Sequence, residues 1–172
     1  MNNQMIWKIA GLAIFILLQA VIFNHVVLFG IAFCFVYLAF LIGLPFEMGS
    51  ILAMLIGLIT GLSIDMFVDS IGIHASACVL IMFFRPYLLQ FITPLGGYPN
   101  DSSPTSAAMG LAWYTTYALP LIFVHHFVLF FVEYGGFNLF FRTMTKVIAT
   151  TLFTYLMVVL IGYLMSSQRA KR

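Results

Sequence analysis

Four positions at regular spacing are the strongest chemical feature of this sequence. Ala53, Gly57, Gly61 and Asp65 follow one another at four-residue intervals within an apolar stretch. On a helix such positions lie along one face, and small residues at this spacing let a neighbouring backbone approach closely. We predict either a tight helix crossing inside this fold, with the carboxylate solvated at the membrane interface, or a groove in which Asp65 anchors a partner or a second helix.

Further charged side chains lie near the ends of the apolar stretches. Glu133 and Arg142 are nearly symmetric about Phe137, where the chain turns, so two antiparallel helices would hold them at equal depth. Lys146 follows Arg142 by one helical turn. We therefore predict one polar cluster in the outer leaflet that joins three spans, formed by Asp65, Asp69, Glu133, Arg142 and Lys146. The alternative is separate interfacial charges that contribute at most ~1 kcal/mol each.

Arg85 precedes Pro86 inside an apolar stretch, where a charged group needs a physical reason. If 48–66 and 71–92 form an antiparallel hairpin, Arg85 and Asp65 differ in depth by about 14 Å at the rise of an α-helix. A direct ion pair between them is therefore not expected. We expect Arg85 to extend toward the cytoplasmic headgroups or to bind a lipid phosphate.

Side chains that could perform catalysis or bind a metal are not arranged for either task. His125 and His126 point in different directions on a helix, and the sequence has no His-Glu-x-x-His or Cys-x-x-Cys motif. Nucleophilic catalysis needs a serine or cysteine beside a base, and two aspartates on one helix do not form the dyad of an intramembrane aspartyl protease. We predict that the protein is not an enzyme and uses no metal or cofactor. Gln19 is expected to hydrogen-bond to a neighbouring helix.

Composition places these residues in a membrane. Of the 172 residues, 63% are apolar and 7% are charged, whereas soluble domains carry roughly 25% charged residues. The two cysteines, Cys34 and Cys78, are too few for a disulfide-stapled domain. A net charge of +2 without a basic stripe excludes a nucleic-acid partner, and 19 phenylalanines exclude disorder. A polytopic membrane protein, in contact with lipid, remains.

Six stretches are long enough to span a membrane, which takes about 20 apolar residues each. We predict an all-α protein with a single integral membrane domain over 1–172, and spans over 5–23, 26–44, 48–66, 71–92, 108–134 and 139–165. Asn24-His25 is the predicted turn between the first two spans, because one helix over both would be about 60 Å long. The polar, proline-containing segment 93–106 is predicted to be a loop.

The positions of lysine and arginine predict the orientation of the chain. Lys8 lies near its start, and Arg169, Lys171 and Arg172 lie at its end. With six spans both termini lie on one side of the membrane, and we predict that this side is cytoplasmic. The 93–106 loop then faces the cytoplasm as well.

The run from Gly57 to Ala75 resembles the rod shape-determining protein MreD family. That family shows Gly-x-x-x-Gly-x-x-x-Asp at the end of one span, then a short outer turn, then Leu/Ile-Gly and a small residue that open the next span. Gly57, Gly61 and Asp65 match the first part, and Ile71-Gly72 with Ala75 matches the second. Arg85-Pro86, where the family more commonly has an aromatic and an apolar residue, departs from the family pattern, as does the length of the 93–106 loop.

The resemblance implies a non-catalytic subunit of the cell-elongation machinery in the bacterial inner membrane. Proteins of that family associate with the single-span protein MreC. They act beside MreB filaments, the RodA glycosyltransferase and a penicillin-binding transpeptidase in lateral peptidoglycan synthesis. Their fold is similar to that of the substrate-binding components of energy-coupling-factor vitamin transporters. The alternative function is therefore a small-solute binding subunit of a transporter, which predicts an enclosed, partly aromatic cavity.

Overall fold

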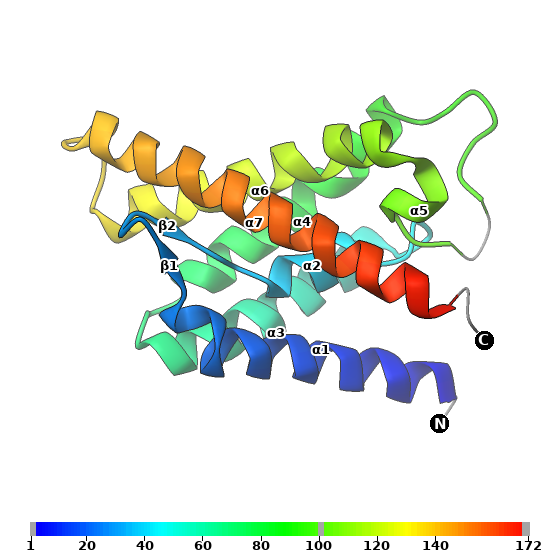
Figure 1. Cartoon of the computed structure of the whole chain (residues 1–172), viewed down its shortest axis with the longest axis horizontal. Coiled ribbons are helices and arrows are strands. Elements are labelled where there is room, and N and C mark those ends of the chain that lie inside the picture. The colour runs from blue at the N-terminus through cyan, green and yellow to red at the C-terminus, as the bar shows by residue number, and fades with distance from the viewer. Residues whose placement is uncertain (1–2, 100–101, 170–172) are drawn as a thin grey trace.

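A bundle of long helices makes up most of the molecule. The computed structural model describes the backbone of residues 3–99 and 102–169, and side chains within 10–99 and 102–164. In chain order the elements are α1 (Asn3–Val21), a 3-10 helix η1 (Phe23–His25), β1 (Val27–Leu28), β2 (Ala32–Phe33), α2 (Tyr37–Ile42), α3 (Ser50–Val68), α4 (Ile73–Phe91), α5 (Ser106–Met109), α6 (Leu111–Glu133) and α7 (Phe140–Arg169). The helix α1 begins at the same end of the molecule at which α7 ends (Figure 1).

Four helices are long and apolar enough to cross a membrane. They are Ser50–Val68, Ile73–Phe91, Leu111–Glu133 and Phe140–Leu164, and they coincide with the last four predicted spans. The helix α1 covers most of the predicted first span, and together with η1 its described residues form a shorter apolar helix, Ala10–His25. The part of the chain that the structure describes therefore has four candidate spans where the sequence predicts six.

The predicted second span over 26–44 is wrong as a helix. Its first part is an antiparallel hairpin in which Val27 lies opposite Phe33. The turn of this hairpin contains Phe29 and Gly30, both left-handed with φ of 52° and 73°. Residues 34 and 35 belong to no helix or strand, and α2 then adds only six residues. Aromatic and β-branched residues favour extended backbone, and hydropathy alone does not separate such a segment from a helix.

The same segment nevertheless runs the length of the bundle. At one end Phe33 packs near the ring of Phe130, close to the C-terminal end of α6. At the other end the ring of Phe46 stacks on Tyr98, in the loop that follows α4. The chain thus runs as a broken element from the end at which α1 stops toward the end at which α1 begins, and α3 begins after it.

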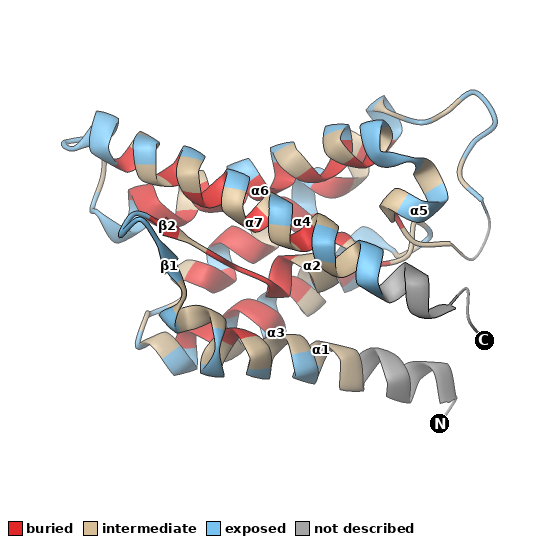
Figure 2. Cartoon of the chain, viewed as in Figure 1, coloured by how far each residue is buried: buried red, intermediate tan, exposed pale blue. Residues whose placement is uncertain are grey.

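The core lies around this broken element and the inner faces of α4 and α6. Figure 2 shows buried residues along β2, α2 and the inward sides of these helices, with exposed residues on the outer sides of α3 and α7. The exposed residues include large apolar side chains, such as Ile51 and Met66 on α3, which are 74% and 82% exposed. Apolar outer faces of this extent, on helices of spanning length, fit a membrane-embedded, mostly helical protein.

Candidate functional site

The small-residue stripe of α3 (Ala53, Gly57 and Gly61) is buried, and its glycines pack against α4. A Cβ atom on Gly57 would lie 3.1 Å from the backbone oxygen of Cys78. A Cβ atom on Gly61 would overlap the backbone of Ala75. The two helices therefore meet backbone to backbone, as small residues at this spacing allow. The stripe therefore lies in a tight helix crossing inside this chain, as the first prediction has it. Asp65, however, is 5% exposed and not solvated, and it anchors a second helix, as the other prediction has it.

Asp65, at the end of the stripe, caps the N-terminus of α4. Its two carboxylate oxygens accept hydrogen bonds from the backbone amides of His74 and Ala75, each at 3.0 Å. The Ser70 hydroxyl donates to the same carboxylate at 2.5 Å, and Nδ1 of His74 lies 3.0 Å from it. Gly72, the N-cap residue of α4 with φ of 76°, has no side chain to do this. A carboxylate from the preceding helix thus pairs first-turn amides that otherwise lack partners.

The predicted outer polar cluster does not form as one group. Nζ of Lys146 lies 3.7 Å from the carboxylate of Glu133 and donates a hydrogen bond to the hydroxyl of Tyr134 at 3.2 Å. Arg142, the predicted partner of Glu133, is exposed and has no ion pair among the described residues. Asp69 is exposed at the left-handed C-cap of α3.

The choice of Lys146 over Arg142 has a visible cause. Its ammonium group lies 4.7, 4.2 and 4.9 Å from the ring centroids of Phe33, Phe130 and Tyr134. Aromatic faces attract a cation at these distances, so the lysine is held on the side of α7 that meets α6 and the hairpin. The symmetry of Glu133 and Arg142 about the turn therefore does not predict which cation lies beside Glu133.

Gln19 of α1 pairs the backbone of the broken element. Its side-chain amide donates to the carbonyl of Cys34 at 3.1 Å and accepts from the backbone amide of Val36 at 2.8 Å. Non-helical backbone at membrane depth persists only where protein groups satisfy it. Gln19 therefore bonds to another element, as expected, but that element is an unwound segment and not a helix.

Two threonines of α7 complete this pairing from the other side. The hydroxyl of Thr150 accepts from the amide of Phe33, and that of Thr154 accepts from the amide of Phe35, each at 3.2 Å. Neither threonine was among the residues predicted from the sequence. Their four-residue spacing inside an apolar helix is a signal that could have found them, because it places two polar groups on one face.

A cluster of buried aromatic and histidine side chains lies beside the broken element. The hydroxyl of Tyr37 lies 2.9 Å from Nε2 of His125, and the thiol of Cys78 lies 3.8 Å from the same nitrogen. Nδ1 of His126 lies 3.1 Å from the hydroxyl of Thr151. Among the described residues no group of three or more His, Cys, Asp or Glu side chains is placed to hold a metal ion. The sequence predicts the divergence of the two histidines, but not the tyrosine, cysteine and threonine they meet.

Arg85 is buried, which corrects the expectation that it extends to the membrane surface. Its Nε donates to the hydroxyl of Tyr117 at 2.8 Å, and Nη2 donates to the carbonyls of Leu44 and Pro45 at 2.5 and 3.0 Å. The residue is 2% exposed. The arginine therefore ties α4 to α6 and to the chain that follows α2, and Asp65 is not its partner.

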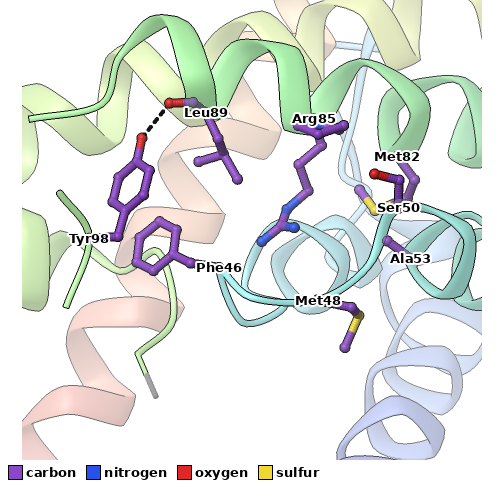
Figure 3. A pocket seen from close by; sticks show the side chains of 9 residues that line it. Phe46, Met48, Ser50, Ala53, Met82, Arg85, Leu89 and Tyr98 are labelled. Carbon is purple, nitrogen blue, oxygen red and sulfur yellow. Dashed lines mark hydrogen bonds between the residues drawn. The ribbon is translucent and has the colours of Figure 1, made fainter. Parts of the chain in front are cut away.

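A cavity of about 140 Å³ lies beside this arginine. Figure 3 shows the Arg85 side chain extending from α4 toward the loop before α3, with Tyr98 and Phe46 together on one side. The rings of Tyr98 and Phe46 are stacked with centroids 4.2 Å apart, and the Tyr98 hydroxyl donates to the carbonyl of Leu89 at 2.6 Å. Burial raises the pKa of the Tyr98 phenol. The loop 93–99 thus closes one side of the cavity.

Comparisons with protein families, with curated proteins and with solved structures found no match to this chain. Function is therefore inferred from the contacts of the chain itself and from the motif shared by α3 and α4.

Proposed function

We propose that this protein is a non-catalytic, six-pass subunit of the cell-elongation complex in the bacterial inner membrane, with both termini in the cytoplasm. It would bind an MreC-like single-span protein and act beside MreB filaments, the RodA glycosyltransferase and a penicillin-binding transpeptidase. The observation that carries the proposal is the motif from Gly57 to Ala75, which resembles that of the MreD family. The matching residues all contact α4 here: the two glycines allow its backbone to approach closely, and Asp65 caps its N-terminus.

The packing of the stripe changes where such a partner would bind. Because α4 covers the glycine face of α3, a single-span partner would contact the outer, apolar faces of the bundle. On α3 one such face carries Leu55, Ile59 and Leu62, which are 50%, 57% and 46% exposed. On α7 another carries Leu152 and Leu156, which are 58% and 60% exposed.

The alternative, a small-solute binding subunit, has less support. Sites for drug-sized ligands have volumes of roughly 300–1,000 Å³ and a few placed polar groups. The cavity beside Arg85 is partly aromatic but measures about 140 Å³. A larger hollow of about 310 Å³ lies on α6 and α7, and its lining, which includes Leu119, Phe123 and Leu152, is almost wholly apolar. Neither hollow combines the size and the polar groups that a vitamin-type solute needs.

Photo-crosslinking in native membranes tests the proposal. A crosslinking amino acid is placed singly at Leu55, Ile59, Leu152 and Leu156, with buried Ala77 as the matched control. We expect one face to capture an MreC-like protein, the control to capture none, and depletion of the protein to convert rods into spheres. The proposal is overturned if depleted cells keep their shape and neither crosslinking nor copurification recovers such a protein.

A further inference from the structure

Arg85 is a buried cation that has no anion within the described residues. Its three hydrogen bonds go to the neutral oxygens of Tyr117, Leu44 and Pro45. A guanidinium stays protonated in proteins and carries five N–H donors, so the two donors on Nη1 have no partner in the described chain. Removing a charge from water without a counter-charge is costly. An anion beside this group would therefore be bound favourably.

None of the carboxylates that the structure describes forms an ion pair with Arg85. Asp65 caps α4, and Glu133 lies beside Lys146. Glu47, in the loop before α3, is exposed and forms no ion pair within the described residues. Asp101 lies outside the described residues and is the rival anion to be tested.

The N-terminus of α3 supplies a second set of donors at the same cavity. Ser50 is the first residue of this 19-residue helix and lines the cavity together with Arg85. The N-cap residue is Gly49, and none of the described side chains caps this end. Uncapped first-turn amides and the positive end of the helix dipole favour an anion. The hydroxyl, the helix end and the guanidinium therefore border one space.

We infer that this cavity binds a phosphate group carried by a membrane lipid. A guanidinium matches the oxygens of a phosphate with two parallel hydrogen bonds. The walls beside it are mostly apolar and include Phe46, Met48 and Leu89, which suits the carbon atoms attached to a lipid phosphate better than a free, fully hydrated ion. The volume of about 140 Å³ admits a phosphate and its first carbon atoms.

The position of the cavity along the helices agrees with this ligand. A helix of 19 residues, as α3 and α4 both are, is about 28 Å long and matches the hydrocarbon thickness of a bilayer. Ser50 opens α3, and Arg85 lies about 9 Å before the C-terminal end of α4. The cavity therefore lies toward one end of both helices, and for helices of spanning length such an end lies close to the lipid phosphates of one leaflet.

Lipid binding to the full chain tests the inference. The protein is placed in nanodiscs of phosphatidylcholine with or without phosphatidylglycerol, and retained lipid is measured by native mass spectrometry together with the melting temperature. We expect retained phosphatidylglycerol and a higher melting temperature in its presence. Arg85→Gln should weaken phosphatidylglycerol binding about tenfold or more, as expected for the loss of a charged hydrogen-bonding group. Arg142→Gln, at an exposed arginine without an ion pair, should bind as the wild type does.

A second variant keeps the test decisive if Arg85→Gln fails to fold. Ser50→Asp places a carboxylate beside the guanidinium and at a helix N-terminus, where a negative charge is favourable. We expect this variant to fold, to keep its melting temperature without anionic lipid, and to lose its preference for phosphatidylglycerol.

Three outcomes would overturn the inference. The first is equal retention of phosphatidylglycerol by the wild type and by folded Arg85→Gln or Ser50→Asp. The second is an equal rise in melting temperature with inorganic phosphate alone in phosphatidylcholine, which would assign the site to the free ion. The third is that the wild type shows no preference for phosphatidylglycerol whereas the Asp101→Asn variant does. This result would identify Asp101 as the counter-ion of Arg85.

Discussion

Gln19→Met removes the side chain that pairs the backbone of the broken element. Gln19 is 2% exposed, and its amide bonds to the carbonyl of Cys34 and the amide of Val36. Methionine has a similar length, so the space stays filled while both hydrogen bonds are lost. The structure gives these two backbone groups no other partner among the described residues.

The expected cost follows from leaving two buried groups unpaired. Each such group costs ~1–3 kcal/mol, which sums to ~2–6 kcal/mol. Hydrogen bonds between membrane helices average only ~0.6 kcal/mol, because helices separated in the membrane find other partners. The smaller value is the lower bound for the loss of stability per hydrogen bond in Gln19→Met. At ~2–4 °C per kcal/mol for a chain of this size, a loss of ~3 kcal/mol lowers the melting temperature by ~6–12 °C.

Thermal unfolding in nanodiscs measures this loss, and hydrogen exchange at the Val36 amide locates it. Gln90→Met, at an exposed glutamine of α4, is the matched control and should leave both quantities unchanged. The expected role of Gln19 is refuted if Gln19→Met and Gln90→Met have the same melting temperature and the Val36 amide of Gln19→Met exchanges as slowly as in the wild type.

Two further predictions concern the helix contacts. Gly61→Ala should destabilise the protein by ~1–3 kcal/mol, because the added Cβ enters the backbone of α4 and forces it to shift. Gly96→Ala, where no atom lies within 4 Å of the added Cβ, should change stability by less than ~0.5 kcal/mol; equal melting temperatures of the two variants would contradict the packing argument. Glu133→Lys should destabilise by repulsion from Lys146, and Lys146→Glu should partly restore the melting temperature of that variant. Rescue by Arg142→Glu instead would show that the arginine is the true partner.

The membrane class and four of the long helices could be predicted from the sequence. Each of these helices satisfies its own backbone hydrogen bonds and is apolar over a spanning length, so the information lies within about 20 consecutive residues. The four-residue spacing of Gly57 and Gly61 likewise predicts a close approach by another helix. It does not say which helix, and the contact with Ala75 shows that the neighbour belongs to the same chain.

The rest was decided only by tertiary structure. Segment 26–44 is as apolar as its neighbours, yet residues 33–36 within it are not helical. Gln19 of α1 and two threonines of α7, Thr150 and Thr154, supply hydrogen bonds to this stretch of backbone. Lys146 lies beside Glu133 because three aromatic rings, one from β2 and two from the C-terminal end of α6, hold it there. Hydropathy records how well a residue tolerates lipid and not which distant group will bond to it. The membrane class and most of the helices were therefore set by local properties of the chain. The broken element and the pairing of its buried polar groups depended on which helices came to lie together.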